Sequence, residues 1–269
     1  MLATIERFQF DFSDDVYIMR RRASFPELML NRGYDGIQVM NFRDRRVVTT
    51  INFPHSVGDF PIETWLITPD GVRSYLFSRD RSEVVVAVNH LVGRCEVVMA
   101  PKNLEAPTGL CWFTPELHIR DYYGRNWRLH GQTFREARED SLPNSVKHLL
   151  RIEDRARSLG VLRMCYDQLG MYVMSDSKIG YLSLDGRYEY ITDRDKGDID
   201  LALVNNSLLI CSPRHVRVVR DNEQSIFLSA RADEGFACIE EYSLDGTKYV
   251  SVLAVREDAN GSRLYISSI

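Results

Sequence analysis

Short runs of β-branched, aromatic and other apolar residues alternate with turn residues along most of the chain. Asp-Gly pairs recur between such runs at 35–36, 70–71, 185–186 and 245–246. This pair is typical of a hairpin, because glycine adopts a positive φ angle and aspartate tolerates one. The pattern therefore predicts an all-β protein with mostly antiparallel strands.

The second half of the chain divides into three units of similar length. The first two units each contain four strand-like runs, whereas the last contains only three. The segment 5–12, at the other end of the chain, has strand-like character and is a candidate for the missing strand. Such pairing of the two ends of the chain would leave no open sheet edge there. The units cover 161–192, 198–228 and 236–267.

The first half fits the same scheme with three further units. Four runs over 16–53 predict one unit, and four runs over 62–99 predict a second. A third unit over 109–130 lacks a strand. The whole chain thus predicts about six units, each of four short strands, which is the arrangement of propeller blades.

One segment interrupts the β pattern. Residues 133–160 are rich in Glu, Arg, Ala and Leu, and Thr133 with Glu136 fits a capping box. An amphipathic pattern over 143–159 predicts a helix that ends at Gly160. The segment is then a helical insertion in a single domain of 1–269. The alternative is a linker between two β-domains of 1–130 and 160–269.

The strand and turn pattern resembles the β-propeller repeat families over most of the chain. The Trp-Asp ending, the Gly-His opening and the kelch double glycine are all missing from the sequence. The resemblance therefore implies a propeller-like architecture and transfers no functional residues.

Composition narrows the class of protein. Apolar residues make up 44% and charged residues 27%, with a net charge of −4, which is the balance of a soluble globular protein. Only Arg20–Arg22 gathers positive charge, so nucleic acid is not an expected partner. No apolar run approaches the roughly 20 residues that span a membrane. Five irregularly spaced cysteines favour reduced thiols and a cytoplasmic location.

Four acidic residues form the sharpest local cluster. Carboxylates of this density, with Gly197 to allow a tight turn, are ligands that suit Ca²⁺. The glycine comes one position early for a calcium loop, and the terminal glutamate is missing. The alternative is a solvated loop whose charges discourage edge pairing. The candidate ligands are Asp193, Asp195, Asp198 and Asp200.

Aromatic residues near 120–127 form a second candidate site. The segment has the pattern of a hairpin turn, which would place its aromatic side chains near a loop tip. Tyr122, Tyr123 and Trp127 are then candidates for contact with a partner protein, because tyrosine and tryptophan anchor interfaces. The alternative is packing in the core.

Three classes of function remain open. The sequence contains no phosphate-binding loop, zinc-protease motif or nucleophile elbow, which favours a non-enzymatic protein without a cofactor. The first class is therefore a module that binds another protein, such as a cytoplasmic inhibitor or an immunity protein that neutralises a toxin or enzyme. The second is a metal-dependent hydrolase or lactonase-type propeller, whose residues would come from several units. The third is a sensory or regulatory β-domain.

Overall fold

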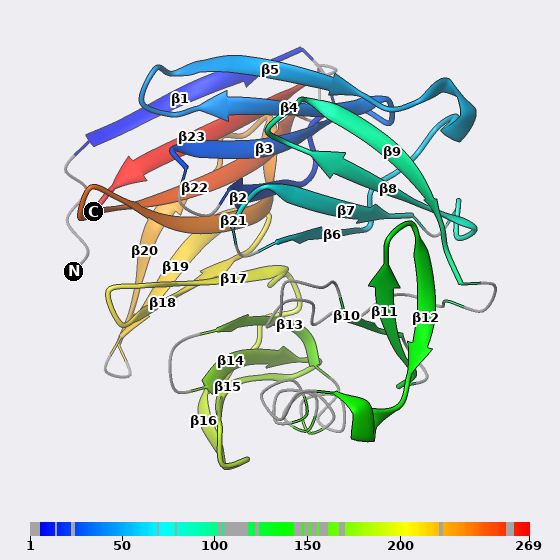
Figure 1. Cartoon of the computed structure of the whole chain (residues 1–269). Helices are drawn as coiled ribbons and strands as arrows, with labels where there is room; N and C mark the ends of the chain where they lie inside the picture. The colour runs from blue at the N-terminus through cyan, green and yellow to red at the C-terminus, as the bar shows by residue number, and fades with distance from the viewer. Residues whose placement is uncertain are drawn as a thin grey trace. The chain divides into compact units, whose positions relative to one another are not determined.

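The chain forms an all-β structure of antiparallel sheets, shown by a computed structural model (Figure 1). Contacts divide it into two units, one of Met1–Arg21 with Arg151–Ile269 and one of Arg22–Leu150. The structure describes residues 6–13, 15–22, 25–68, 70–78, 80–101, 104, 118–121, 124–142, 147, 151, 155, 161–166, 170–220, 223–256 and 261–269.

Three four-stranded sheets belong to the first unit, and their strand orders are β13-β14-β15-β16, β17-β18-β19-β20 and β1-β23-β22-β21. The strands match the runs expected from the sequence. They are β1 (Glu6–Phe12), β13 (Val161–Tyr166), β14 (Gly170–Ser175), β15 (Lys178–Ser183), β16 (Tyr188–Asp193), β17 (Asp200–Val204), β18 (Ser207–Cys211), β19 (His215–Arg220), β20 (Glu223–Ser229), β21 (Glu234–Leu244), β22 (Thr247–Arg256) and β23 (Ser262–Ser268).

The N-terminal strand completes the last sheet, as the sequence predicted. β1 pairs antiparallel with β23 along its whole length, from Glu6 opposite Ser268 to Phe12 opposite Ser262. Every residue of β23 is buried, and the strand lies between β1 and β22 in the sheet. The two ends of the chain therefore share one sheet.

Two of the Asp-Gly pairs, 185–186 and 245–246, each follow Ser-Leu and form hairpin turns, as expected. Asp245 and Gly246 join β21 to β22 with φ angles of 50° and 78°, the conformation that this residue pair favours. Gly186, between β15 and β16, has a φ angle of 84°. Both turns thus have their glycine at positive φ, but Asp245 also has a positive φ angle and Asp185 does not.

The second unit contains a four-stranded and a seven-stranded sheet. The four-stranded order is β2-β3-β4-β5. The unit boundary falls inside β2, so Met19–Arg21 belong to the first unit and only Arg22 of this strand belongs to the second. The seven-stranded order is β10-β11-β12-β9-β8-β7-β6. The strands are β2 (Met19–Arg22), β3 (Glu27–Arg32), β4 (Gly36–Asn41), β5 (Arg46–Asn52), β6 (Thr64–Ile67), β7 (Arg73–Phe77), β8 (Val84–Asn89), β9 (Arg94–Met99), β10 (His118–Arg120), β11 (Asn126–His130) and β12 (Thr133–Ala137).

The seven-stranded sheet corrects two expectations. The second and third predicted units are joined, because Thr133 of β12 bridges Met99 of β9. Thr133 and Glu136 lie in a strand, so the capping-box interpretation was wrong. β12 pairs with β11 around a turn at Gly131, whose φ angle is 63°. Strand pairing here overrides the local preference for helix. β12 is also the strand that the third unit lacked.

The predicted helix over 143–159 lies mostly outside the described residues. Lys147, Arg151 and Arg155 are described singly, each with helical backbone. A 3-10 turn, Glu139–Ser141, follows β12. β12 and this turn occupy residues 133–141, so the predicted helical insertion over 133–160 does not begin at 133. The helix over 143–159 stays a prediction.

Apolar faces of neighbouring sheets pack together in the first unit. One core cluster combines residues of β17–β19 with residues of β21–β23, among them Val204, Val216 and Val252. Cys95, Cys165, Cys211 and Cys238 carry free thiols, whereas Cys111 lies outside the described residues. Over the described part of the chain, none of the helical segments is long and apolar enough to cross a bilayer.

Candidate functional site

Trp127 packs against the core of the second unit. It lies on β11 at intermediate exposure, beside buried residues that include Ile119 and Leu129. Its indole Nε1 donates a hydrogen bond to Oδ2 of Asp121, 3.2 Å away. The guanidinium of Arg125 lies 5.7 Å from the ring centroid. These contacts account for Trp127 as a structural residue.

Tyr122 and Tyr123 lie outside the described residues. Partner binding by these two side chains and Trp127 therefore stays a prediction.

The aspartate loop is organised around an arginine. Asp198 is fully buried, and its Oδ2 accepts hydrogen bonds from the backbone N–H of Asp195, at 2.9 Å, and from Nη2 of Arg217. Nη1 of Arg217 also lies 2.8 Å from Oδ2 of the exposed Asp195. Burial raises the pKa of Asp198, and the positive charge of Arg217 opposes that increase. Arg217 thus places a positive charge beside two of the four aspartates.

The other two aspartates are used elsewhere. Asp193 is exposed at the end of β16. Asp200 accepts hydrogen bonds from the backbone N–H groups of Leu201, at 3.0 Å, and Ile239, at 3.1 Å. Among the described residues, no three His, Cys, Asp or Glu side chains are close enough to share a metal ion. Calcium binding by the four aspartates stays a prediction.

Asp200 belongs to a charge cluster that the sequence did not reveal. In the first unit, β17 contacts both β13 and β21, which are edge strands of their own sheets. Nη1 of Arg20, on β2, lies 3.1 Å from Oε1 of Glu240, on β21. Arg20 also interacts electrostatically with Asp200. Each side chain comes from a different strand, so no linear motif could identify the cluster.

The cluster changes the acidity of Glu240. Burial raises its pKa to about 7, Arg20 opposes the increase, and the charge of Asp200 adds to it. Burial also raises the pKa of Asp200, which Arg20 again opposes. A carboxyl group that titrates near neutral pH is unusual and marks a possible functional site.

A separate network fastens β1 to its sheet. Glu234, at the start of β21, is 0% exposed, and its Oε2 lies 2.8 Å from Nη1 of Arg263 on β23. Nε of Arg263 lies 2.6 Å from Oδ1 of Asp11 on β1. The hydroxyl of Tyr265 donates a hydrogen bond to Oε1 of Glu234. This network joins three strands of the closed sheet and has a structural role.

The second unit exposes a group of apolar side chains to solvent. The turn between β8 and β9 exposes Leu91 by 64% and Val92 by 61%. Val47 and Val48 on β5 are exposed by 41% and 40%. A Cβ atom added to Gly93 would lie 3.9 Å from Cγ2 of Thr49, so the turn lies beside β5. We call Val47, Val48, Leu91 and Val92 the β5 edge surface.

Polar anchors hold the apolar turn in place. The ring Nε2 of His90 lies 2.5 Å from Oγ of Ser74, and Oδ1 of Asn89 accepts a hydrogen bond from the N–H of Leu91. Burial, with a smaller effect from Arg22, lowers the pKa of His90 to about 4. The imidazole is therefore neutral at pH 7. The turn presents its apolar residues on a preorganised support.

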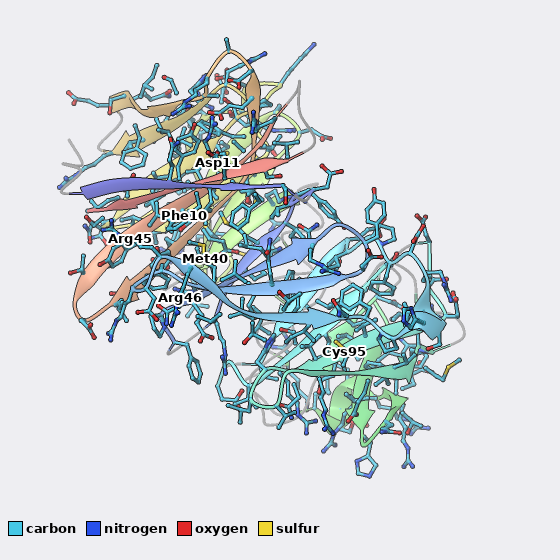
Figure 2. The ribbon with its side chains drawn as sticks, turned by 90° about the horizontal axis from the view of Figure 1, so that it is seen from above. Phe10, Asp11, Met40, Arg45, Arg46 and Cys95 are labelled. Atoms are coloured by element: carbon cyan, nitrogen blue, oxygen red, sulfur yellow. The ribbon has the colours of Figure 1, made fainter. Side chains whose placement is uncertain are left out.

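The surroundings of the β5 edge surface carry positive charge. Arg45 and Arg46 stand at the turn between β4 and β5 (Figure 2), and Arg43 and Arg94 are also exposed nearby in the chain. Asp44 is the acidic residue of the same turn. β5 is the last strand of its sheet among the described strands, and five consecutive residues from Arg46 are exposed. An exposed edge strand rich in β-branched residues is a template for contact with another chain.

Comparisons with known proteins leave the function open. No family model and no curated protein matches the chain. A solved structure, that of U3-55K, covers 97% of this chain and 98% of its own at a TM-score of 0.61, with 9% sequence identity. It is one of 1032 solved chains that match. At this identity the likeness concerns the fold alone.

Proposed function

We propose that the protein is a non-enzymatic protein-binding module with a propeller-like β architecture. Successive antiparallel sheets, with the N-terminal strand completing the last one, support the architecture. A fold likeness over 97% of the chain agrees with a single structural domain over 1–269. The binding function rests on a different observation, the β5 edge surface.

The β5 edge surface carries the proposal because its exposure has a cost. Hairpin turns normally hold polar residues, yet this turn exposes Leu91 and Val92 by more than half. Anchoring by His90 and Asn89 keeps the two side chains presented to solvent. Clustered exposed apolar groups on a soluble protein mark interaction sites. A partner that covers them would recover the hydrophobic free energy that their exposure forgoes.

The charges around the β5 edge surface indicate which charge the partner's contact surface should carry. The whole chain has a net charge of −4, which favours a basic partner. The exposed arginines around the β5 edge surface instead favour an acidic partner face with apolar side chains at its centre. An inhibitor or immunity protein of this kind would neutralise its toxin or enzyme by covering such a face. The proposed partner is another protein, in the cytoplasm.

The test compares three tagged proteins in affinity capture from the native lysate. Wild-type protein and the control variant Ile226→Ser should retain the same stoichiometric partner. Ile226 is a suitable control because it is 67% exposed on β20, away from the β5 edge surface in the chain. Leu91→Ser/Val92→Ser should lose at least about tenfold in affinity, since two apolar anchors are removed.

The comparison of partner binding is valid only if the three proteins are equally stable. All three proteins should unfold within about 0.5 kcal/mol of one another in urea, because the changed residues are exposed. Retention of the partner by Leu91→Ser/Val92→Ser would place the interface elsewhere. A lysate without any stoichiometric partner would contradict the binding function itself.

A second candidate function follows from the Arg20–Glu240–Asp200 cluster. Glu240, with a pKa near 7, has the acidity of a general base. Two carboxyl groups from different strands agree with a metal-dependent hydrolase or lactonase with a distributed site. Hydrolysis of a lactone and ester panel in the presence of Ca²⁺, lost in Glu240→Gln, would support this function over binding alone.

A further inference from the structure

A pocket in the first unit lies between two neighbouring sheets. It has a volume of about 260 Å³, slightly below the roughly 300–1,000 Å³ of pockets for drug-sized ligands. Its walls come from β14–β16 on one side and from β18 and β19 on the other. The volume suits a metabolite of amino-acid size.

One wall is a row of three side chains on one sheet face. Tyr172 of β14 is opposite Tyr181 of β15, and Tyr181 is opposite Glu189 of β16. Cross-strand partners project from the same face, so the three residues form a continuous strip. The two tyrosine rings have centroids 5.0 Å apart and planes tilted by 60°. The strip offers aromatic surface that ends in an exposed carboxylate.

The opposite wall combines an apolar floor with a positive rim. Leu208 and Val219 are cross-strand partners, exposed by only 3% and 5%, and they belong to the core beneath the pocket. Arg220 follows Val219 at the end of β19 and is exposed. The lining therefore combines aromatic and aliphatic residues with two charged residues, Glu189 and Arg220, on strands of different sheets.

We propose that this pocket binds a small zwitterion with an aromatic group, of the size and charge pattern of an aromatic α-amino acid. The aromatic group packs on Tyr172 and Tyr181 and covers Leu208 and Val219. The ammonium group faces Glu189, and the carboxylate faces Arg220. Charge-assisted hydrogen bonds at the rim fix the orientation, while the apolar walls supply most of the affinity.

The experiment measures binding of L-phenylalanine by calorimetry and by saturation-transfer NMR. We expect a dissociation constant of about 0.1–1 mM, as befits a small ligand. Two analogues separate the charges, since 2-phenylethylamine lacks the carboxylate and 3-phenylpropionate lacks the ammonium group. Both analogues should bind about three- to tenfold more weakly than the amino acid.

Substitution of two exposed residues at the pocket tests where the ligand binds. Glu189→Gln should weaken L-phenylalanine binding about three- to tenfold and leave 3-phenylpropionate binding unchanged. Arg220→Gln should weaken the amino acid similarly and leave 2-phenylethylamine unchanged. The controls Glu136→Gln and Arg187→Gln remove equally exposed charges that do not line the pocket. They should bind like the wild-type protein.

Three results would overturn the proposal. One is the lack of binding of L-phenylalanine up to about 10 mM. A second is binding that neither Glu189→Gln nor Arg220→Gln weakens, because the ligand would then lie elsewhere. The third is equal binding of 2-phenylethylamine and the amino acid, which would make the ligand an organic cation.

Discussion

Two edge regions of this molecule treat exposed strands in opposite ways. β1, at the edge of its sheet, carries charged residues, and Asp11 (Figure 2) pairs with Arg263 of the adjacent strand. Arg263 continues the network to the buried Glu234. β5 has the composition Arg-Val-Val-Thr-Thr-Ile-Asn, with no charge after its first residue. Its neighbouring turn adds the exposed Leu91 and Val92.

Under the proposed function, the difference between the two edges separates stability from recognition. Charged side chains on an edge strand discourage pairing with other chains, and the β1 network also binds the edge to its own sheet. The β5 edge surface lacks that protection and gains little for the isolated protein. An edge that keeps apolar residues in water is better explained by a partner than by folding.

The largest expected effect comes from breaking the charge network that fastens β1 to its sheet. Glu234→Ala should lower the free energy of unfolding by about 3–5 kcal/mol, because Arg263 remains 7% exposed without its buried partner. Urea denaturation measures the loss. The control is Asp185→Ala, which breaks the highly exposed pair with Arg187 and should lower the stability far less. Equal losses in both variants would deny the network its structural role.

A smaller effect is the pH dependence of stability that comes from Glu240 on β21, in the same sheet as β1. Folding raises the pKa of Glu240 from 4.5 to about 7, so the folded state binds the proton more tightly than the unfolded state. The resulting stability is present below about pH 4.5 and is lost as the pH rises through about 7, by at most about 3 kcal/mol. Glu240→Gln should remove this part of the pH dependence in urea denaturation.

The control for this measurement is the next residue along β21. Glu241→Gln changes a side chain that is 27% exposed and paired with Arg21. Because Glu240 is intact in that variant, the decline in stability between about pH 5 and pH 8 should remain. If Glu240→Gln keeps the decline as well, the assigned pKa of Glu240 is wrong.

The smallest effect sharpens the contrast between the two edges directly. Phe10→Lys on β1 should destabilise the protein by about 1–3 kcal/mol, since Phe10 is half-buried opposite the buried Leu264. Val48→Lys on β5 should change stability by less than about 0.5 kcal/mol. Thermal or urea unfolding of the two variants gives the comparison. A large loss in Val48→Lys would show that β5 is needed for folding.

Much of the fold could be predicted because strands and turns are local. Alternating apolar runs located the strands of five sheets, and Asp-Gly pairs located hairpins such as 245–246. Thr133 and Glu136 led to a wrong prediction. A capping box is a local signal too, and the pairing of β12 with β11 outweighed it. The bridge from Thr133 to Met99 joins two predicted units and has no signal in the sequence.

The candidate sites were less accessible to prediction. The aspartate loop was recognised as a cluster, but its partner Arg217 lies two strands away, on β19. The sequence shows Arg20–Arg22 only as a run of positive charge, whereas in the structure Arg20 pairs with Glu240 from a distant part of the chain. The exposure of Leu91 and Val92 could not be inferred, since an apolar pair at a turn is equally compatible with burial.

The sequence by itself determined the all-β class and the hairpin turns, because both depend on short-range periodicity and turn chemistry. It also indicated the pairing of the two chain ends, because the last unit is one strand short and the segment 5–12 has strand-like character. Only the tertiary structure decided which charges are neutralised by buried partners, which carboxyl titrates near neutral pH and which apolar residues meet water. Those properties depend on burial and on distances between residues far apart in the chain, and the order of residues along a strand does not encode them locally.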